Sequence, residues 1–237
     1  MRRQPRGVQQ ERSALTRNKT AKGYAEKQAK DRAERIIECL KSEYPQARIV
    51  LNYSNSLELL IAVILSAQCT DKKVNEVTAD LFRKYRDVHD YAAALPEELE
   101  QDIRATGFFR NKAKNIKGAA AMIIERFGGE VPATMEELIQ LPGVARKTAN
   151  VVLGNAFGVI EGVAVDTHVK RLSNRLGLSD STDPEKIERD LMIVIPKDEW
   201  FTFTYLLIEH GRAVCDAKRP RCDKCLLNDD CLSAFIF

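Results

Sequence analysis

The sequence predicts an all-α protein of two helical lobes, and three observations lead to this prediction. Apolar residues recur at helical spacing along most of the chain, as Ile36, Ile37 and Leu40 do among charged residues. The strict alternation of apolar and polar residues that marks a half-buried strand is almost absent. At 237 residues, the chain is long enough for one large or two small domains.

Capping residues and turns bound the individual helices. Ser56 is expected to cap the second helix, and Thr134 with Glu137 fits a capping box. Asp183 followed by Pro184 opens a later helix. The expected helices cover residues 28–43, 57–67, 72–86, 88–94, 97–105, 111–127, 134–141, 147–157, 167–176, 184–194 and 198–213.

A segment without amphipathic helix, residues 158–166, divides these helices into two groups. We interpret this segment as a crossing between two lobes. One lobe is predicted to comprise residues 49–160, and the other to combine residues 29–48 with residues 161–237.

Positive charge is concentrated at the N-terminus. Residues 1–30 hold nine Lys or Arg and two Glu, a net +7, so the other 207 residues sum to −4 in a chain of net +3. A basic arm over residues 1–28 indicates a polyanionic partner, although composition alone slightly favours a solvated, disordered terminus. No apolar run reaches the roughly 18 residues of a membrane span, so no membrane partner is expected.

The stretch "LPGVARKTANVVLG", residues 141–154, predicts a tight turn between two short helices. Backbone N–H groups at the start of the second helix have no intrahelical partner, and such donors suit a phosphate. Val144 is expected to pack the turn against the body of the lobe. The motif alone fits a hairpin that grips a nucleic-acid backbone and a plain helical corner equally well.

Lys147 lies at the start of this second helix, where cations are disfavoured. It is either a solvated surface lysine or an amine that reacts. The helix N-terminus and Arg146 raise the local positive potential, which favours a neutral, nucleophilic amine. Asp166 follows the apolar residues "VAV" and could serve such an amine, although the pattern alone favours a helix N-cap.

Four of the six cysteines crowd near the C-terminus with the spacing C-x6-C-x2-C-x5-C: Cys215, Cys222, Cys225 and Cys231. Without an export signal, this pattern favours a metal over disulfides. The thiolates could hold zinc or an iron–sulfur cluster, and zinc is the commoner structural ion. Cys39 and Cys69, in apolar stretches, are expected to be core thiols.

Basic residues also lie between the first two of these four cysteines. Lys218, Arg219 and Arg221 could hold a loop toward phosphates, or could serve solubility alone.

Taken together, "LLIAVILSAQCTD", "TGFFRNKAKNI", "LPGVARKTANVVL", "AVDTHV" and the cysteine spacing resemble the endonuclease III family of the helix-hairpin-helix DNA glycosylase superfamily. The resemblance covers roughly residues 30–233. It implies a six-helix domain with the hairpin over 49–160, an iron–sulfur domain over the other lobe, and DNA bound in a cleft between them. It also implies one 4Fe-4S cluster on the four cysteines, in place of zinc.

The resemblance makes Lys147 the nucleophile that attacks C1′ of a damaged nucleoside and Asp166 its carboxylate partner. It implies base excision repair of oxidised pyrimidines such as thymine glycol, followed by AP lyase cleavage 3′ to the lesion through a Lys147 Schiff base. The implied partner is duplex DNA with damaged bases or abasic sites, bound by a monomer in the bacterial cytoplasm, at the nucleoid. The implied DNA contacts are Gln68, Phe108, Pro142, Gly143, Val144, Ala145, Arg146, Thr167, His168, Lys218, Arg219 and Arg221.

Gln68 would fill the space left by a flipped nucleotide. Two residues depart from the family pattern: Ala145 replaces a usual hairpin glycine, and Phe108 stands where relatives often have a leucine wedge. His168 could contact a phosphate, although a hydrogen bond within the helix start is favoured, and His210 is expected to be structural.

Two other functions stay open. A monofunctional relative, such as an adenine glycosylase, usually lacks the lysine and carries a further C-terminal domain, whereas here the sequence ends six residues after Cys231. A non-catalytic metal-cluster DNA-binding protein would have no use for Lys147 and Asp166.

Overall fold

The computed structural model describes residues 26–236, and this part of the chain forms helices, turns and loops with no β-strand. The all-α prediction is therefore confirmed for these residues. None of the helices in this range is both long enough and apolar enough to cross a membrane. Most of the expected basic arm, residues 1–25, lies outside the described residues, whereas residues 26–28 already belong to a helix, in which Glu26 pairs with Lys30.

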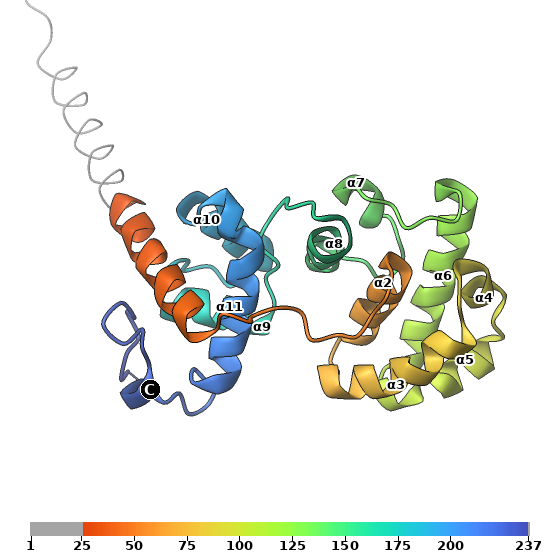
Figure 1. Cartoon of the computed structure of the whole chain (residues 1–237), viewed down its shortest axis with the longest axis horizontal. Helices are drawn as coiled ribbons and strands as arrows, with labels where there is room; N and C mark the ends of the chain where they lie inside the picture. The colour runs from red at the N-terminus through yellow and green to blue at the C-terminus, as the bar shows by residue number, and fades with distance from the viewer. Residues whose placement is uncertain (1–25, 237) are drawn as a thin grey trace, which may run out of the picture. The chain divides into compact units, whose positions relative to one another are not determined.

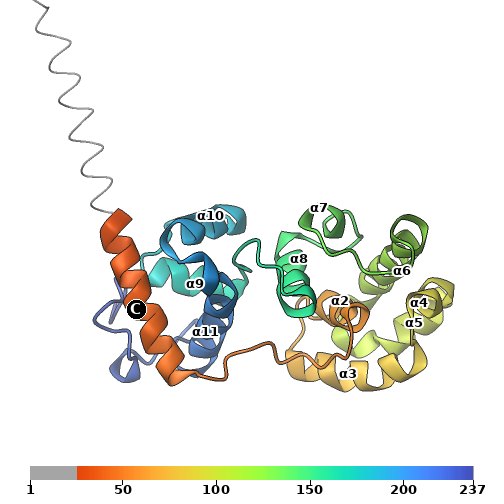
Figure 2. The same cartoon turned by 45° about the horizontal axis from the view of Figure 1, so that its top comes forward.

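The chain divides into two compact units. The middle unit is Arg48–Asp166, and the terminal unit joins the described residues up to Ala47 with those from Thr167 onward. Figures 1 and 2 show the helices of each unit in two views.

Helix α2 forms the centre of the middle unit. Its residues 59–65 are all buried, so every face of the helix is covered, as its apolar sequence requires. It packs against α3, α6 and α8. The elements of this unit are α2 (Ser56–Leu65), α3 (Asp71–Lys84), α4 (Val88–Ala93), α5 (Pro96–Asp102), the 3-10 turn η1 (Arg104–Thr106), α6 (Phe109–Phe127), α7 (Met135–Leu138), α8 (Arg146–Val152) and the π-helical turn η2 (Leu153–Phe157).

The start of α2 differs from the prediction by one residue. Asn55, not Ser56, is the cap, because its side chain accepts a hydrogen bond from the Glu58 N–H at 2.9 Å. Thr134 is confirmed as the cap of α7, because its hydroxyl accepts a hydrogen bond from the Glu137 N–H, and the same hydroxyl donates to the Glu137 carboxylate.

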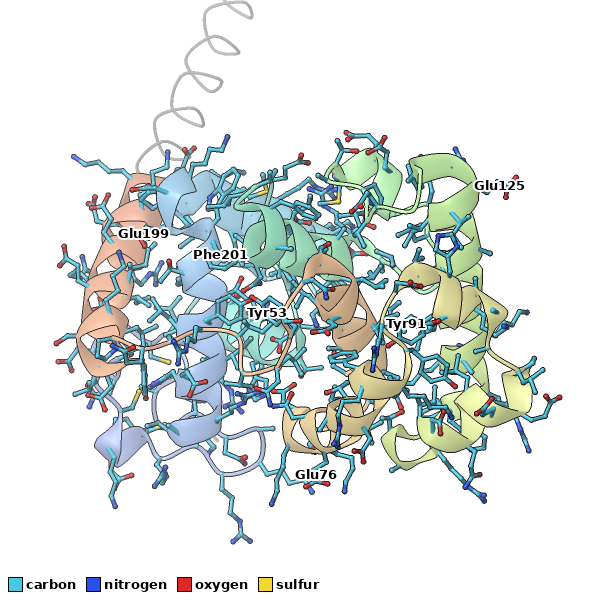
Figure 3. The ribbon with its side chains drawn as sticks, turned by 45° about the vertical axis from the view of Figure 1, so that its right-hand side comes forward. Tyr53, Glu76, Tyr91, Glu125, Glu199 and Phe201 are labelled. Carbon is cyan, nitrogen blue, oxygen red and sulfur yellow. The ribbon has the colours of Figure 1, made fainter. Side chains whose placement is uncertain are left out.

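The middle unit buries two stacked tyrosine rings and carries exposed carboxylates on its surface. Tyr91 is fully buried and stacks on Tyr85, with ring centroids 5.0 Å apart. Figure 3 shows Tyr91 among the helices of this unit, while Glu76 and Glu125 extend from its surface.

The terminal unit packs α9 against α10 and α11. A further helix over residues 26–43 buries the stripe Ala33, Ile36, Ile37 and Leu40. Cys39 lies off this stripe and is exposed, so the expectation of a core thiol there is wrong. The elements of this unit are that helix, α9 (Thr167–Arg175), α10 (Pro184–Val194), η3 (Lys197–Glu199), α11 (Trp200–Ala213) and η4 (Cys222–Lys224).

Candidate functional site

The hairpin between α7 and α8 is a tight turn that only glycine fits. Gly143 has φ +80°, and a Cβ there would lie 2.9 Å from both Cβ and Nδ2 of Asn115 on α6. The Val144 N–H closes the turn on the Leu141 carbonyl at 3.0 Å. The close approach to Asn115 fixes the turn against α6.

Apolar contacts hold the same hairpin on the unit. Leu141 is buried, and Val144 is only 6% exposed, which confirms its expected packing. Pro142 lies against Gly118 of α6, where a Cβ would meet the proline ring at 3.1 Å. The turn is thus placed by two neighbouring positions of one helix.

Ala145 adopts an ordinary extended backbone, with φ −92° and ψ 170°, at the N-cap position of α8. A methyl group is unstrained in this region, so the alanine needs no glycine-like freedom. Its side chain cannot cap the helix, and no side-chain hydrogen bond caps the start of α8. The first N–H groups of α8 therefore face no side-chain acceptor at the cap.

Lys147 is the second residue of α8 and is half-buried. Within the described residues its ammonium group makes no hydrogen bond or ion pair. Arg146, the first residue of α8, is also half-buried and is engaged in an interaction of its own. A lysine held in this way at a helix start is available to a bound substrate.

Asp166 is the last residue of the middle unit and directly precedes α9. The three residues before it, Val163, Ala164 and Val165, are buried, as their apolar sequence predicts. Asp166 itself is half-buried and engaged in interactions. Lys147 and Asp166 thus belong to the same compact unit.

Gln68 and Phe108 share an uncommon backbone conformation. Both are exposed non-glycine residues with positive φ, 52° at Gln68 and 48° at Phe108. Phe108 is 66% exposed and stands at the N-cap of α6. Such left-handed residues cost on the order of 1 kcal/mol or more and cluster at functional sites. The sequence did not predict this shared conformation.

Lys112 is a functional candidate that the sequence analysis missed. It is only 3% exposed, and its Nζ donates hydrogen bonds to the carbonyls of Leu65 and Thr106, both at 2.8 Å. Burial lowers the pKa of this ammonium. The signal in the sequence is a lysine on the buried stripe of α6, where Ala113 and Ile116 follow.

The four clustered cysteines line one cavity in the terminal unit, which holds about 290 Å³ of empty space, part of it open to solvent. The lining cysteines are Cys215, Cys222, Cys225 and Cys231, all of them free thiols. Four convergent sulfurs are the donor set of a 4Fe-4S cluster. Within residues 26–236, no group of three or more His, Cys, Asp or Glu side chains is arranged to hold a single metal ion.

Polar groups from two helices, α9 and α11, contact these sulfurs. Arg175 of α9 donates to Cys215 Sγ at 3.1 Å and to the carbonyls of Asp216 and Ala217. His210 Nε2 of α11 lies 3.4 Å from Cys225 Sγ. Sequence reasoning did not find Arg175, because nothing in its local pattern separates it from a solvated arginine.

The other ring nitrogen of His210, Nδ1, lies 3.2 Å from the hydroxyl of Tyr44, which directly follows the helix over 26–43. Burial lowers the pKa of His210 to about 4, so the ring is neutral at neutral pH. The expectation that His210 is structural agrees with these contacts.

The basic loop between the first two cysteines is exposed at Lys218, Arg219 and Arg221. Asp216 Oδ1 accepts hydrogen bonds from the N–H groups of Lys218 and Arg219, which shapes the loop locally. Their side chains thus extend from an ordered turn.

At the start of α9, Thr167 is exposed. His168 Nδ1 lies 3.2 Å from Arg171 Nη2, which is a contact within the helix start. The same Arg171 nitrogen donates to the carbonyls of Gly211 and Cys215.

Comparison with known proteins agrees with this arrangement. Residues 61–197 match the HhH-GPD superfamily base excision DNA repair protein family. The chain is 57% identical over 205 residues to an endonuclease III of Synechocystis sp., a match that covers 86% of this chain and 94% of the relative. It is 51% identical over 189 residues to an endonuclease III of Bacillus subtilis, covering 79% and 86%.

Solved structures give the same result. An endonuclease III in a non-covalent complex with DNA superposes with a TM-score of 0.83 at 48% identity, over 86% of this chain and 96% of that chain. A thermostable thymine-DNA glycosylase, at 22% identity and a TM-score of 0.77, shares the fold. With these identities and this coverage, the chain belongs to the HhH-GPD superfamily of base excision DNA repair proteins and, within it, to the endonuclease III family.

Proposed function

We propose that this chain removes oxidised pyrimidines, such as thymine glycol, from duplex DNA and then cleaves the strand through Lys147. Its family makes it a base excision repair DNA glycosylase and AP lyase. The observation that carries the finer proposal is the half-buried Lys147 beside the hairpin, in one unit with Asp166.

The hairpin accounts for DNA binding without sequence reading. The first N–H groups of α8 and the tight turn at Gly143 suit a phosphate of the DNA backbone. Lys147 follows directly, so a phosphate bound at the turn brings the neighbouring sugar toward its amine. Exposed Lys218, Arg219 and Arg221 and the start of α9 add phosphate contacts in this proposal.

The chemistry requires a neutral amine. The Lys147 Nζ lone pair forms a bond to C1′ while the bond from C1′ to the base breaks, and the base leaves with that electron pair and a proton. Asp166 stabilises the positive charge that develops on the sugar and assists proton transfer. The sugar ring then opens and the amine becomes a Schiff base.

Strand cleavage follows from the Schiff base. Loss of a proton from C2′ gives an enamine, and the electrons of the enamine then return to form a double bond between C2′ and C3′ while the bond between C3′ and its oxygen breaks. That oxygen departs on the 3′ phosphate with the electron pair of the broken bond. Water then hydrolyses the imine and returns Lys147 to its amine form.

Access to C1′ needs an extruded nucleotide, because the base is enclosed in the duplex stack. We assign this task to Gln68 and Phe108, which we call the insertion residues. Gln68 would fill the vacated space, and Phe108 would stack into the duplex as a wedge. Their exposure and their held backbone conformation support this role.

A 4Fe-4S cluster is proposed for the cysteine cavity. Cys215, Cys222, Cys225 and Cys231 would hold it as thiolates, and the bound cluster would fix the fold of the basic loop. Arg175 would hold the loop by its bonds to Cys215 Sγ and two carbonyls. The lobe that carries these cysteines would then be the iron–sulfur domain, and residues 49–160 the hairpin domain.

The proposed setting follows from the same family. The enzyme would act as a monomer on damaged or abasic duplex DNA in the bacterial cytoplasm, at the nucleoid. A 48% identical endonuclease III, described as trapped in a covalent intermediate with DNA, supports the covalent step.

Borohydride trapping tests the central assignment. Wild type and Lys147→Gln are each mixed with duplexes that contain one thymine glycol or one abasic site. A covalent adduct is expected with wild type alone, because borohydride reduces the Schiff base to a stable amine.

The other outcomes separate the alternatives. An adduct that survives Lys147→Gln would assign the nucleophile to another amine. Base release without any adduct would indicate a monofunctional glycosylase, and DNA binding without base release would indicate a non-catalytic binding protein.

A further inference from the structure

Lys112 connects the two turns that carry the insertion residues. Leu65, whose carbonyl accepts one of its hydrogen bonds, lies three residues before Gln68. Thr106, whose carbonyl accepts the other, lies two residues before Phe108. One buried ammonium thus joins two turns that are about forty residues apart in the sequence.

The two acceptors are helix ends. Leu65 is the last residue of α2, and Thr106 is the last residue of the 3-10 turn η1. Carbonyls at such ends lack intrahelical partners and carry partial negative charge, so a cation is favoured there. The ammonium therefore satisfies two buried acceptors at once, and the two acceptors in turn offset the cost of its burial.

The backbone of Lys112 also contacts an insertion residue. Its N–H donates to the Phe108 carbonyl at 3.1 Å in the first turn of α6. Phe108 therefore follows Gly107, whose φ is +70°, and its carbonyl is hydrogen-bonded to Lys112. Phe108 is the N-cap of α6, and no side-chain hydrogen bond caps the helix there.

We propose that Lys112 is a positioning residue that sets the spacing and backbone conformation of Gln68 and Phe108 for nucleotide extrusion. This inference rests on the proposed function of those two residues. Lys112 does not touch the reacting atoms in this proposal. Its effect falls on the extrusion step and not on the chemistry at Lys147.

A second lysine of α6 offers a matched control. Lys117 Nζ donates to the carbonyls of Ala92 and Ala94, at the C-terminal end of α4. It makes the same kind of bond from the same helix, but to a segment that carries no insertion residue. Lys117→Met and Lys112→Met therefore each remove an ammonium group that donates to two backbone carbonyls, but only Lys112→Met affects the turns that carry the insertion residues.

Two substrates separate extrusion from chemistry. A stacked thymine glycol must be extruded before excision, whereas an abasic site has no base to unstack. For Lys112→Met we expect single-turnover release of thymine glycol to fall about tenfold, as the loss of one or two buried hydrogen bonds implies, with borohydride trapping on the abasic duplex nearly unchanged. Lys117→Met is expected to leave the ratio of the two rates at the wild-type value.

A fluorescent base analogue placed beside the lesion gives an independent readout of extrusion. Its signal should rise more slowly with Lys112→Met than with Lys117→Met. Equal loss on both substrates, or the same change of ratio in both variants, would overturn the proposal. Absence of trapping in wild type would instead overturn the proposed function.

The variant Lys112→Arg keeps the test usable if Lys112→Met does not fold. A guanidinium keeps the charge and the donors but is longer and planar, so it would displace the two turns. We expect a selective loss on thymine glycol compared with Lys117→Arg. A wild-type ratio of rates in a folded Lys112→Arg would contradict a positioning role.

Discussion

Gly143 occupies a position where a side chain has neither the backbone conformation nor the room that it needs. Its φ of +80° disfavours any L-residue, and Asn115 fills the space where a Cβ would stand. Gly128, at the end of α6, shares the positive φ but has nothing within 4 Å of its would-be Cβ. A comparison of substitutions at Gly143 and Gly128 therefore separates the cost of the backbone conformation from the cost of crowding.

Gly143→Ala is expected to lower the free energy of unfolding by about 2–3 kcal/mol, against about 1 kcal/mol for Gly128→Ala, because only the first also crowds Asn115. Gly143→Ala should weaken binding to undamaged duplex DNA as well, since the turn moves away from α6. Urea unfolding and fluorescence anisotropy measure the two effects. Equal stability losses in the two variants would mean that Asn115 moves aside freely.

The sequence carries a signal for candidate residues that lie in a motif, but it carries no signal for residues that are distinguished only by their backbone conformation. Lys147, Asp166 and the cysteines were predicted from motifs together with the family resemblance. The left-handed backbone at Gln68 and Phe108 was not, because glutamine and phenylalanine carry no sequence signal for positive φ. Lys112 was missed because a lysine is normally assigned to the surface, and its two acceptors come from distant turns.

At the scale of elements, the segment that carries the four clustered cysteines, residues 215–233, depends on α9 for its position. Arg175 binds Cys215 Sγ and the carbonyls of Asp216 and Ala217, all on the stretch that leads into the basic loop. The Ser233 N–H donates in return to the Arg175 carbonyl, at 3.1 Å. This one residue thus contacts both ends of the segment.

Arg175→Gln is expected to loosen the segment over residues 214–221 while the helices stay folded. Hydrogen exchange of its amides should accelerate about tenfold or more, because the segment loses three charged hydrogen bonds. The visible absorbance of a bound iron–sulfur cluster should also fade faster under oxidant. Arg189→Gln, an exposed position on α10, serves as the control, and unchanged exchange would show that the cysteines hold the segment alone.

Helix bounds followed from apolar periodicity and from capping residues. The predicted helix over residues 88–94 is α4, and the one over 184–194 is α10, to within a residue. The cap at Asn55 was misplaced because Ser56 has an equally good capping side chain, and the backbone conformation decides between them. The single helix predicted over 147–157 changes from α to π at Leu153, which no apolar pattern signals.

At the scale of the whole molecule, charge is distributed unevenly along the chain. Residues 1–25 carry seven Lys or Arg and one Glu, in a chain whose net charge is only +3. They lie outside the described residues and outside the stretch that resembles the family. We propose that this arm adds affinity for DNA without adding specificity.

Deletion of residues 1–25 is therefore expected to flatten the dependence of DNA affinity on salt. Each phosphate contact that is lost should lower the slope of log K against log salt by about 0.9. Base release at low salt should change little, because the arm contains no residue assigned to the chemistry. A slope that is the same with and without the arm would refute the proposal.

The fold class was predictable because helical periodicity runs through most of the chain, and the structure confirms it for the described residues. The grouping of the N-terminal helix with the C-terminal helices was harder to predict. Local pattern carries no information on which distant helices pack together, and only the segment around 158–166 indicated a division.

The burial of residues 59–65 on every face of α2 has a consequence for the chain before it folds. Residues 59–65, "LLIAVIL", are uncharged, free of proline and rich in β-branched side chains, which is the composition of an aggregation-prone segment. Glu58 precedes the stretch, and the next charge toward the C-terminus is at Asp71. In a newly made or heated chain, the middle unit has not yet closed around α2, and this stretch is exposed to other chains. Because aggregation between chains rises with their concentration, the yield of refolding should depend on protein concentration more than on the temperature at which refolding ends.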